Sequence, residues 1–557
     1  MKDTAVALRV ARLIFIVSLC LGVQGCATQQ TSAIASAHPL ATAAGQAILD
    51  RGGNAFDAAI AVAAALAVVE PYSSGLGGGG FFLVHRASDA HEVMIDARET
   101  APSGVTPAHY FDSQGRPIPG ATTRGGTAAA IPGLPAGLSH LAQRYGRLPL
   151  AESFAGAVAL ARDGFPVDPR FVLMAKRRES FLRSGVNTRG FLDGDKAPEA
   201  GYILRQPDLA ATFERIARDG AAGFYEGPIA AALVAGVNGA GGAWRASDLS
   251  GYKVVEREPV RFEYRGASIT AAALPSAGGI ALAQALGMLE RFPLERVGAP
   301  DTDHVVVEAL RRAFRDRARH LGDSDFVPVP VATLLAPDYI RKSGSNIDRA
   351  RATPSTTLGP VETVRHGSAS TTHLSVVDAE GNRVAATLTI NLTFGAGLVP
   401  TGTGVLLNNE MDDFSLRPDL PNAFRLRGGG ANGIEPGKRP LSSMTPVFVQ
   451  DDKGVLVVGA PGGSRIVSQV LLAILEYLRA PEVDLARLVS APRYHHQYWP
   501  DVVEIEPEGF SPEWRAAMSA KGHALQTSSR LWGNMQAVFK ARDGAARAAS
   551  DPRGEWY

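Results

Sequence analysis

Cysteine is almost absent from this chain, since its 557 residues include only Cys20 and Cys26. Cys20 lies in an apolar N-terminal segment that we expect to be removed on export, which leaves Cys26 alone in the mature chain. One cysteine can form neither an intrachain disulfide nor a zinc cluster of cysteine ligands. With Cys26 as the one remaining cysteine we also expect no cysteine nucleophile, so any catalysis must use a group other than a thiol.

The chain also has little net charge of either sign. Its 56 Lys and Arg residues against 55 Asp and Glu residues give a formal charge of +1. Such a balance creates no field that attracts nucleic acid or anionic lipid, so we expect no nucleic-acid partner and a small-molecule substrate. The composition, 45% hydrophobic and 20% charged, excludes a disordered chain. No linker-like tract divides the sequence, which favours one or two interleaved domains.

Nucleotide-binding and common hydrolase signatures are missing. Residues 75–80 formally satisfy G-x-G-x-x-G. That fingerprint must follow a strand and open a helix, whereas here a helical pattern precedes the glycines and the strand-like run 81–84 follows them. The sequence contains no G-x-x-x-x-G-K-[ST], no H-E-x-x-H and no G-x-S-x-G. We therefore reject a nucleotide site and expect no cofactor.

The N-terminus has the pattern of an export signal. Three basic residues precede an apolar run over 13–23, which is shorter than the roughly 20 residues of a membrane-spanning helix. The run ends in Val-Gln-Gly-Cys, which resembles a bacterial lipobox whose cysteine is lipidated and becomes the mature N-terminus. We therefore expect a signal peptide over 1–25 and lipidation of Cys26.

An ordinary secretory cleavage near Ala35 or Ala37 is the alternative. The lipobox interpretation predicts a periplasmic protein held at the outer membrane, which contacts the membrane only through its lipid anchor. Residues 27–37 are small and polar, and we expect them to form a flexible tether.

Several segments have clear secondary-structure patterns. We expect two helices over 42–70, separated by Gly-Gly-Asn at 52–54, and another helix over 302–321. The polar segment 344–370 shows no helical or strand period and predicts an exposed loop.

A hairpin pattern follows that loop. Residues 371–377 and 383–394 are expected to be its two strands. Further on, a buried strand over 455–458 leads through a glycine turn over 459–463 into a helix over 464–479. A helix N-terminus directs backbone N–H groups at one point, which predicts an anion site.

Seven short motifs follow one another along the chain. They are Gly-Gly-Asn at 52–54 with Asp-Ala-Ala at 57–59, the run 76–81, Asp-Ala-Arg-Glu at 96–99, Thr-Thr-His at 371–373, Asn-Asn-Glu-Met-Asp-Asp-Phe at 408–414, Lys-Arg-Pro-Leu-Ser-Ser-Met at 438–444 and Pro-Gly-Gly-Ser-Arg at 461–465. In this order they resemble the gamma-glutamyltranspeptidase family of N-terminal nucleophile hydrolases. The resemblance implies a four-layer αββα sandwich made of two subunits cut from one precursor, a large one over 26–370 and a small one over 371–557.

The resemblance implies cleavage between Ser370 and Thr371, with Thr371 as the nucleophile. A mid-chain threonine is a poor nucleophile, but one whose own α-amine has been freed by cleavage carries its general base with it. The strand pattern by itself favours an ordinary β-branched strand residue, and the surrounding motifs reverse that interpretation. By resemblance, Thr389 orients the nucleophile from across the hairpin, and Gly462 and Gly463 bind the oxyanion.

The family's substrate residues fall on polar positions. By resemblance Arg98, Ser442 and Ser443 hold the α-carboxylate of a gamma-glutamyl group, because a guanidinium can bind a carboxylate with two parallel hydrogen bonds. Three further residues match the family's contacts to the α-ammonium: Asn391, Glu410 and Asp413. Taken alone, Arg98 would be a structural ion-pair residue and the acidic stretch a solvated turn.

Two details qualify the match. Phe424 stands where many family members have a tyrosine on a lid over the acyl site, so we expect a lid over 418–438 without its terminal hydrogen bond. Glu410 occupies a position that is Gln or Glu in the family. His495 and His496 are adjacent, and neighbours on a strand point to opposite faces, so we expect structural roles and no metal site.

The activity implied is that of an exported, self-processing gamma-glutamyltransferase. Such an enzyme cleaves glutathione and similar gamma-glutamyl amides and passes the acyl group to water, an amino acid or a peptide. Two alternatives remain open: a cephalosporin or glutaryl acylase of the same fold, and an uncleaved, inactive surface-binding homologue. A retained acid at Asp413 argues for glutamyl, since a glutaryl group has no ammonium to neutralise.

Overall fold

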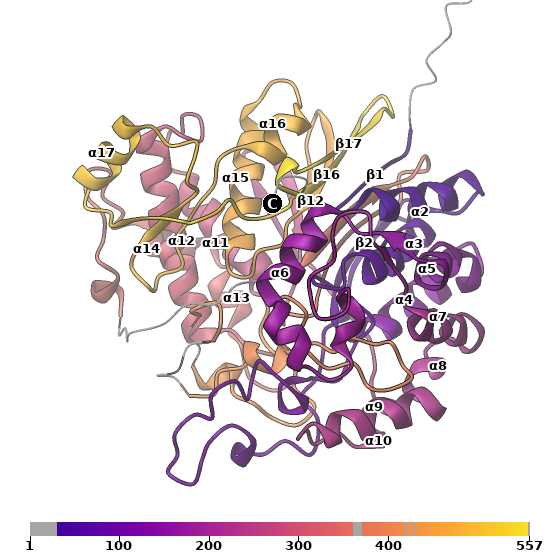
Figure 1. The fold of residues 1–557 in the computed structure, drawn as a ribbon. Coiled ribbons are helices and arrows are strands. Elements are labelled where there is room, and N and C mark those ends of the chain that lie inside the picture. The colour runs from indigo at the N-terminus through magenta and orange to yellow at the C-terminus, as the bar shows by residue number, and fades with distance from the viewer. Residues whose placement is uncertain (1–30, 360–369, 418–419, 421, 427–428, 555–557) are drawn as a thin grey trace, which may run out of the picture.

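The computed structural model describes residues 31–359, 370–417, 420, 422–426 and 429–554, and Figure 1 shows their arrangement. The expected signal peptide over 1–25 and the expected lipidation site at Cys26 lie outside this part of the chain, so both stay predictions. Among the helices of the described residues, none is both long and apolar enough to cross a membrane.

Two six-stranded sheets form the centre of the molecule. Neighbouring strands of the first sheet are β1 (Ala33–Ser36), β9 (Thr372–Val377), β10 (Arg383–Thr389), β2 (Gly79–Arg86), β3 (His91–Ala97) and β6 (Val255–Arg257). The second sheet runs β17 (Ala546–Ser550), β16 (Gln536–Ala541), β12 (Gly454–Gly459), β11 (Val447–Gln450), β8 (Ala267–Ala271) and β7 (Val260–Tyr264). All pairs within these two sheets are antiparallel.

The two sheets pack face to face. β9 and β10 contact β12 and β16 across the interface, and β1 contacts β16 and β17. Every residue of β9 and β10 is buried, which requires a cover on both faces of the sheet. The other sheet covers one face of these strands, and helices cover the other.

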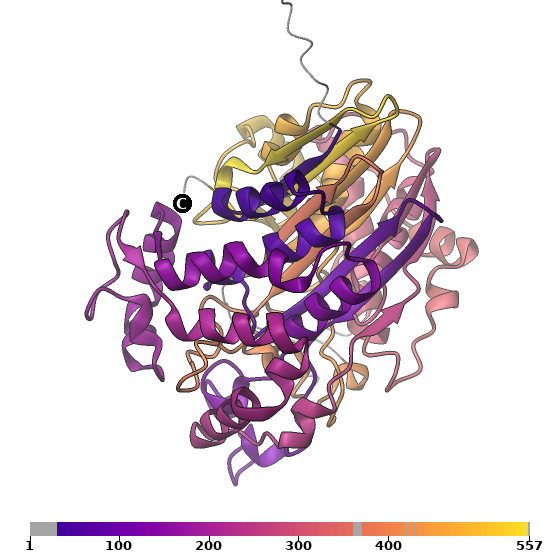
Figure 2. The same cartoon turned by 90° about the vertical axis from the view of Figure 1, so that its right-hand side faces the viewer.

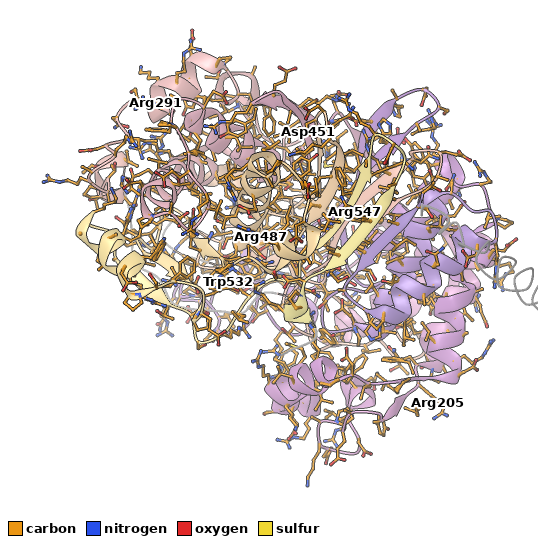
Figure 3. The ribbon with its side chains drawn as sticks, turned by 90° about the horizontal axis from the view of Figure 1, so that it is seen from above. Arg205, Arg291, Asp451, Arg487, Trp532 and Arg547 are labelled. Carbon is orange, nitrogen blue, oxygen red and sulfur yellow. The ribbon has the colours of Figure 1, made fainter. Side chains whose placement is uncertain are left out.

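Helices form the two outer layers. On the first sheet lie α2 (Pro39–Asp50), α3 (Ala55–Val69) and α4 (Leu134–Tyr145), of which α3 contacts β9 and β10 directly, and α5 (Leu150–Asp163) packs on α2 and α3. On the second lie α11 (Gly278–Leu289), α12 (Pro300–His320) and α15 (Arg465–Arg479). Figures 2 and 3 show the strands between these two groups of helices. The expected αββα sandwich is confirmed.

The first two expected helices follow from local chemistry. Asn54 caps α3, since its side chain accepts hydrogen bonds from the N–H groups of Phe56 and Asp57, while Asp57 accepts one from Asn54 in return. Gly52 has φ +87°, which allows the chain to turn between α2 and α3. All of α3 is buried, and its small alanines let it pack directly on the sheet.

Two expectations about the central segment are corrected. The second strand of the hairpin ends at Thr389 instead of residue 394, because Asn391 (φ 73°) and Phe394 (φ 60°) have left-handed backbone conformations that a strand cannot continue through. The segment before Ser370 is also not uniformly exposed. Within it, Ser355 is fully buried and its hydroxyl is bonded by Arg311, so this part packs against α12.

The expected tether is also shorter than predicted. Ala33–Ser36 form strand β1, which pairs with β9 from Ala33 opposite Val377 to Ser36 opposite Leu374. A cleavage near Ala35 or Ala37 would remove an edge strand from the first sheet. A tether can therefore occupy only the residues before β1.

The two expected subunits share one sheet. Strands β9 and β10 lie between β1 and β2, which come from the other side of the Ser370–Thr371 bond. Neither segment could form this sheet alone, so the organisation is interleaved, as the lack of a linker predicts.

Candidate active site

Thr371 lies immediately before β9 and is only 5% exposed. The antiparallel pairing of β9 with β10 brings it beside Thr389, the last residue of β10. The Thr371 hydroxyl donates to Thr389 Oγ1 at 3.4 Å. The hairpin thus brings the expected nucleophile and the expected orienting hydroxyl together.

The peptide bond between Ser370 and Thr371 is held by a specific set of hydrogen bonds. The Thr389 hydroxyl donates to the Ser370 carbonyl oxygen at 2.9 Å, and the N–H of Asn391 donates to Thr389 Oγ1 at 2.7 Å. On the other side, the Ser370 hydroxyl donates to the carbonyl of Tyr72 at 2.5 Å. Thr389 therefore contacts both the hydroxyl that would attack and the carbonyl that would be attacked.

The glycine turn between β12 and α15 lies beside Thr371. Gly462 (φ 137°) and Gly463 (φ 60°) both adopt conformations that favour glycine. A side chain at Gly463 would also collide with Phe424, whose ring carbon Cδ1 would be 2.5 Å from its Cβ. Neither N–H of the pair bonds any group in the described ranges. Two unengaged N–H donors at the start of α15 can bind an oxyanion.

One cavity, here called the Thr371 cavity, joins most of the expected site residues. It is lined by Arg98, Arg317, Thr371, Thr389, Asn391, Glu410, Asp413, Phe424, Leu426, Leu441, Ser442, Ser443, Met444, Gly463, Ser464 and Ile466. Of the ten predicted catalytic and substrate residues, Gly462 is absent from this lining. It borders a second cavity, which also reaches Thr371.

Arg98 is the charged centre of the Thr371 cavity. It directly follows β3, is fully buried, and faces three carboxylates. Its Nη1 is 2.8 Å from Glu410 Oε2 and donates to Glu99 Oε2 at 3.4 Å, while its Nη2 donates to Asp413 Oδ2 at 2.6 Å. Its Nε donates to the carbonyl of Pro440. Arg98 therefore organises the acids of the site.

Burial changes the protonation of these acids. It raises the pKa of the Glu410 carboxyl well above its usual range, against the opposing charge of Arg98. It likewise raises the pKa of Glu99 to about 7. Both shifts favour neutral carboxyls while the cavity holds no further cation. A substrate ammonium placed beside Glu410 would restore its charge.

Several buried polar atoms of this cavity have no hydrogen-bond partner among the described residues. They are Asn391 Oδ1, Glu410 Oε1, Ser443 Oγ and Arg317 Nε, whereas Glu410 Oε2 is ion-paired with Arg98. Most buried polar groups in folded proteins are paired, so a cluster of unpaired ones indicates a ligand site. The first two residues offer acceptors and the last two offer donors, as a zwitterionic ligand requires.

The remaining substrate residues are firmly positioned. Ser442 Oγ accepts a hydrogen bond from the N–H of Met444, and Asn391 Nδ2 donates to the carbonyl of Asn409. Asp413 Oδ1 accepts from Asn422 Nδ2 at 3.2 Å. Asn422 belongs to the expected lid, of which residues 418–419, 421 and 427–428 lie outside the described part. Phe424 of the same segment borders Gly463.

The second cavity at Thr371 is rich in arginine. Its lining includes Tyr72, Ser73, Arg170, Arg177, Ser370, Gly462, Arg465, Arg530 and Trp532, the last of which is labelled in Figure 3. Arg465 pairs with Glu504 at 2.8 Å. Gly462 therefore lines this cationic cavity and Gly463 lines the Thr371 cavity, and both cavities reach the nucleophile.

His495 ends the short strand β13 (Tyr494–His495) and His496 lies just beyond it, and the two side chains have separate partners. His495 contacts Ser468 Oγ at 2.6 Å and Gln497 Oε1 at 2.9 Å, while His496 contacts Asp501. Burial lowers the pKa of both imidazoles, to about 3 and about 4 respectively. No group of three His, Cys, Asp or Glu side chains within the described ranges could hold a metal ion.

Sequence reasoning missed Arg317 as a site residue and gave Glu99 no role. Glu99 stands in one of the quoted motifs, but nothing in the pattern tells that its carboxyl faces Arg98. Arg317 belongs to a helix with five other basic residues between 311 and 320, and the sequence does not distinguish it from them. The position of Arg317 on the apolar face of an amphipathic helix could have indicated that its side chain is buried.

Comparisons with known proteins agree with this geometry. The profile of the gamma-glutamyltranspeptidase family matches residues 41–556. The glutathione hydrolase proenzyme of Escherichia coli (strain K12) is 40% identical over 525 residues, which cover 93% of this chain and 90% of that protein. The acylase ACY 1 proenzyme of Pseudomonas sp. (strain V22) is 36% identical, with coverages of 94% and 92%.

A solved structure shows the same fold. The cephalosporin acylase from Bacillus halodurans superposes with a TM-score of 0.82 at 27% identity, over 94% of this chain and 95% of that one. The family match extends over nearly all of the described residues, including the hairpin, the glycine turn and the acidic cluster. The chain belongs to the gamma-glutamyltranspeptidase family.

Proposed function

We propose that this protein is a self-processing gamma-glutamyltransferase that hydrolyses glutathione and related gamma-glutamyl amides. The observation that carries the proposal is the set of unpaired buried atoms beside Thr371. Asn391 Oδ1 and Glu410 Oε1 can accept from an α-ammonium, whereas Ser443 Oγ and Arg317 Nε can donate to an α-carboxylate. A gamma-glutamyl head group carries both charges.

Maturation would begin with attack of the Thr371 hydroxyl on the Ser370 carbonyl carbon. An ester forms as the Ser370–Thr371 amide bond breaks, and the hydroxyl proton ends on the freed α-amine. Water then hydrolyses the ester, which releases the Ser370 carboxylate and restores the Thr371 hydroxyl. The 2.9 Å hydrogen bond from Thr389 would stabilise the oxyanion during the attack.

Turnover would use the new amine of Thr371 as general base. The hydroxyl attacks the gamma-glutamyl carbonyl and the leaving amine takes up a proton, which leaves a gamma-glutamyl ester on Thr371. Water or an acceptor amine then cleaves that ester. The N–H groups of Gly462 and Gly463 lie beside Thr371, where they can bind the oxyanion of both steps.

The acylase alternative differs in one chemical requirement. A glutaryl group has no ammonium, so it gains nothing from Glu410 and Asp413, and it would leave Glu410 Oε1 without a partner. The relative named glutathione hydrolase and the relative named acylase are both similar to this chain over most of its length. The acids of the Thr371 cavity favour the glutamyl substrate.

A direct test compares glutathione with a glutaryl amide of the same amine on purified, processed protein. We expect a clear preference in kcat/KM for the gamma-glutamyl compound. Equal or better turnover of the glutaryl amide would support the acylase instead. A purified chain that stays as one band on a denaturing gel, with no turnover of either compound, would support the inactive binding protein.

We also propose that the mature chain begins at a lipidated Cys26 and is anchored at the periplasmic face of the outer membrane. The pairing of β1 with β9 supports this start, because cleavage near Ala35 or Ala37 would remove residues that form the sheet. A start at Cys26 keeps β1 intact and leaves a short tether before it.

A further inference from the structure

Arg317 lies on α12 with its side chain in the Thr371 cavity, and it is only 4% exposed. Its side chain makes no hydrogen bond or ion pair with any described residue, and its Nε is a buried donor with no acceptor. Buried arginines are rare unless paired, because removing a cation from water has a large free-energy cost. A buried arginine without a partner therefore indicates that an anion binds beside it.

The other arginines of the same helix show what a paired one looks like. Arg311 bonds Ser355 at 2.6 Å, Arg312 bonds Glu308 at 2.7 Å, and Arg315 bonds Asp316 at 2.6 Å. Each of these three arginines thus has a close acceptor, and each also pairs with at least one carboxylate. Arg317 differs in facing the Thr371 cavity with no such partner.

The pKa of Arg317 is shifted in the direction expected for a buried, unpaired arginine. Burial lowers the pKa of Arg317 to about 10, and only the charge of Asp413 opposes that shift. Arg317 thus stays cationic near neutral pH, with its positive charge poorly compensated. A bound anion would compensate it.

Arg98 is a poor receptor for that anion when it acts alone. A guanidinium has five N–H donors, and those of Arg98 already face Pro440 O and the carboxylates of Glu99, Glu410 and Asp413. An incoming carboxylate would meet these acids before it met an unopposed positive charge. A second cation is needed for tight binding.

We propose that Arg317 binds the α-carboxylate of the gamma-glutamyl donor, as a second cation beside Arg98 and together with the unpaired hydroxyl of Ser443. The inference rests on the proposed function, because it identifies which residue of that site holds one of the substrate's charges. Arg317 is thus a substrate-binding residue, and it selects donors that carry a carboxylate at the α-carbon.

The test uses Arg317→Met, which removes the charge while keeping most of the side-chain length. Arg315→Met is the matched control, since it removes an arginine from the same helix outside the lining of the Thr371 cavity. If the methionine variant fails to mature into two chains, Arg317→Gln takes its place, because its amide is polar without being charged.

The readout is competitive inhibition of gamma-glutamyl anilide hydrolysis by three small acids. L-Glutamate has both α-groups, glutarate lacks the ammonium, and 4-aminobutyrate lacks the α-carboxylate. In Arg317→Met we expect the inhibition constants of glutamate and glutarate to rise about 30-fold or more, which is typical of truncating one partner of a buried charge pair. The constant for 4-aminobutyrate should not change.

Two results would overturn the proposal. An equal loss for all three acids would mean that Arg317 only supports the structure. A loss confined to glutamate and 4-aminobutyrate would mean that it acts through Asp413 on the ammonium. Failure of the proposed function looks different, because the unmutated protein would then not hydrolyse gamma-glutamyl anilides at all.

Discussion

Replacing Thr389 by valine should slow maturation about 100- to 1,000-fold. The hydroxyl has a single proton, and the structure commits it to the Ser370 carbonyl at 2.9 Å. Valine keeps the shape of the side chain and removes that donor from the oxyanion that forms during attack. Loss of one such donor typically raises a barrier by about 2.7 to 4 kcal/mol, which gives the expected factor.

The same substitution has a separate effect on stability. Thr389 Oγ1 also accepts the N–H of Asn391 at 2.7 Å, and valine would leave that buried donor unpaired. We expect a loss of about 1 to 3 kcal/mol in the free energy of unfolding. Thermal unfolding of the precursor measures this loss of stability separately from the slower cleavage.

The assay follows conversion of purified precursor into two chains on a denaturing gel over time. Thr387→Val is the matched control, because Thr387 is buried in the same strand and bonds His373 instead of Ser370. Thr389→Ser should mature much faster than Thr389→Val, since it keeps the hydroxyl. If Thr389→Val matures as fast as Thr387→Val, the hydrogen bond to Ser370 has no role in cleavage and the reasoning is wrong.

Four further predictions concern the nucleophile, two residues of the charge cluster, and the N-terminus. Thr371→Ala should abolish both maturation and turnover, whereas Thr371→Ser should keep both at reduced rates. Cleavage of the Thr371→Ala variant at the same peptide bond would exclude self-cleavage. Asp413→Asn should mature normally but raise KM for gamma-glutamyl substrates, and unchanged kinetics would remove Asp413 from the site. Arg98→Ala should bind donors weakly and should also lower the free energy of unfolding by about 3 to 5 kcal/mol, because Glu99, Glu410 and Asp413 are left buried together without their cation. A thermal unfolding temperature equal to that of the unmutated protein would contradict this. Mass spectrometry of the native N-terminus should find a lipidated Cys26, and an unmodified start after Ala35 or Ala37 would exclude the anchor.

Local patterns predicted much of the fold. Gly-Gly-Asn at 52–54 separates α2 from α3, and a strand, a glycine turn and a helix follow one another from β12 to α15. These features depend on residues that are neighbours in the sequence. The end of β10 was misplaced because the apolar run continues past Thr389, while the left-handed conformations of Asn391 and Phe394 are set by tertiary contacts.

The site was predicted as a set of residues, but its charge arrangement was not. The resemblance placed Arg98 at the α-carboxylate, whereas the structure shows it surrounded by carboxylates from residues 99, 410 and 413. The contacts of Arg98 with Glu410 and Asp413 join segments more than 300 residues apart, so no spacing rule could reveal them. The sequence also does not show that Arg317 is unpaired, since this depends on the fold placing no acceptor within hydrogen-bond distance of its side chain.

The most direct test of the account is the intact mass of the small chain, measured before and after mixing with a gamma-glutamyl substrate and rapid acid quenching. The account predicts a chain that begins at Thr371 and gains the mass of one gamma-glutamyl group, located on Thr371 by fragmentation. A single uncleaved chain, or an acyl group attached to any other residue, would contradict it.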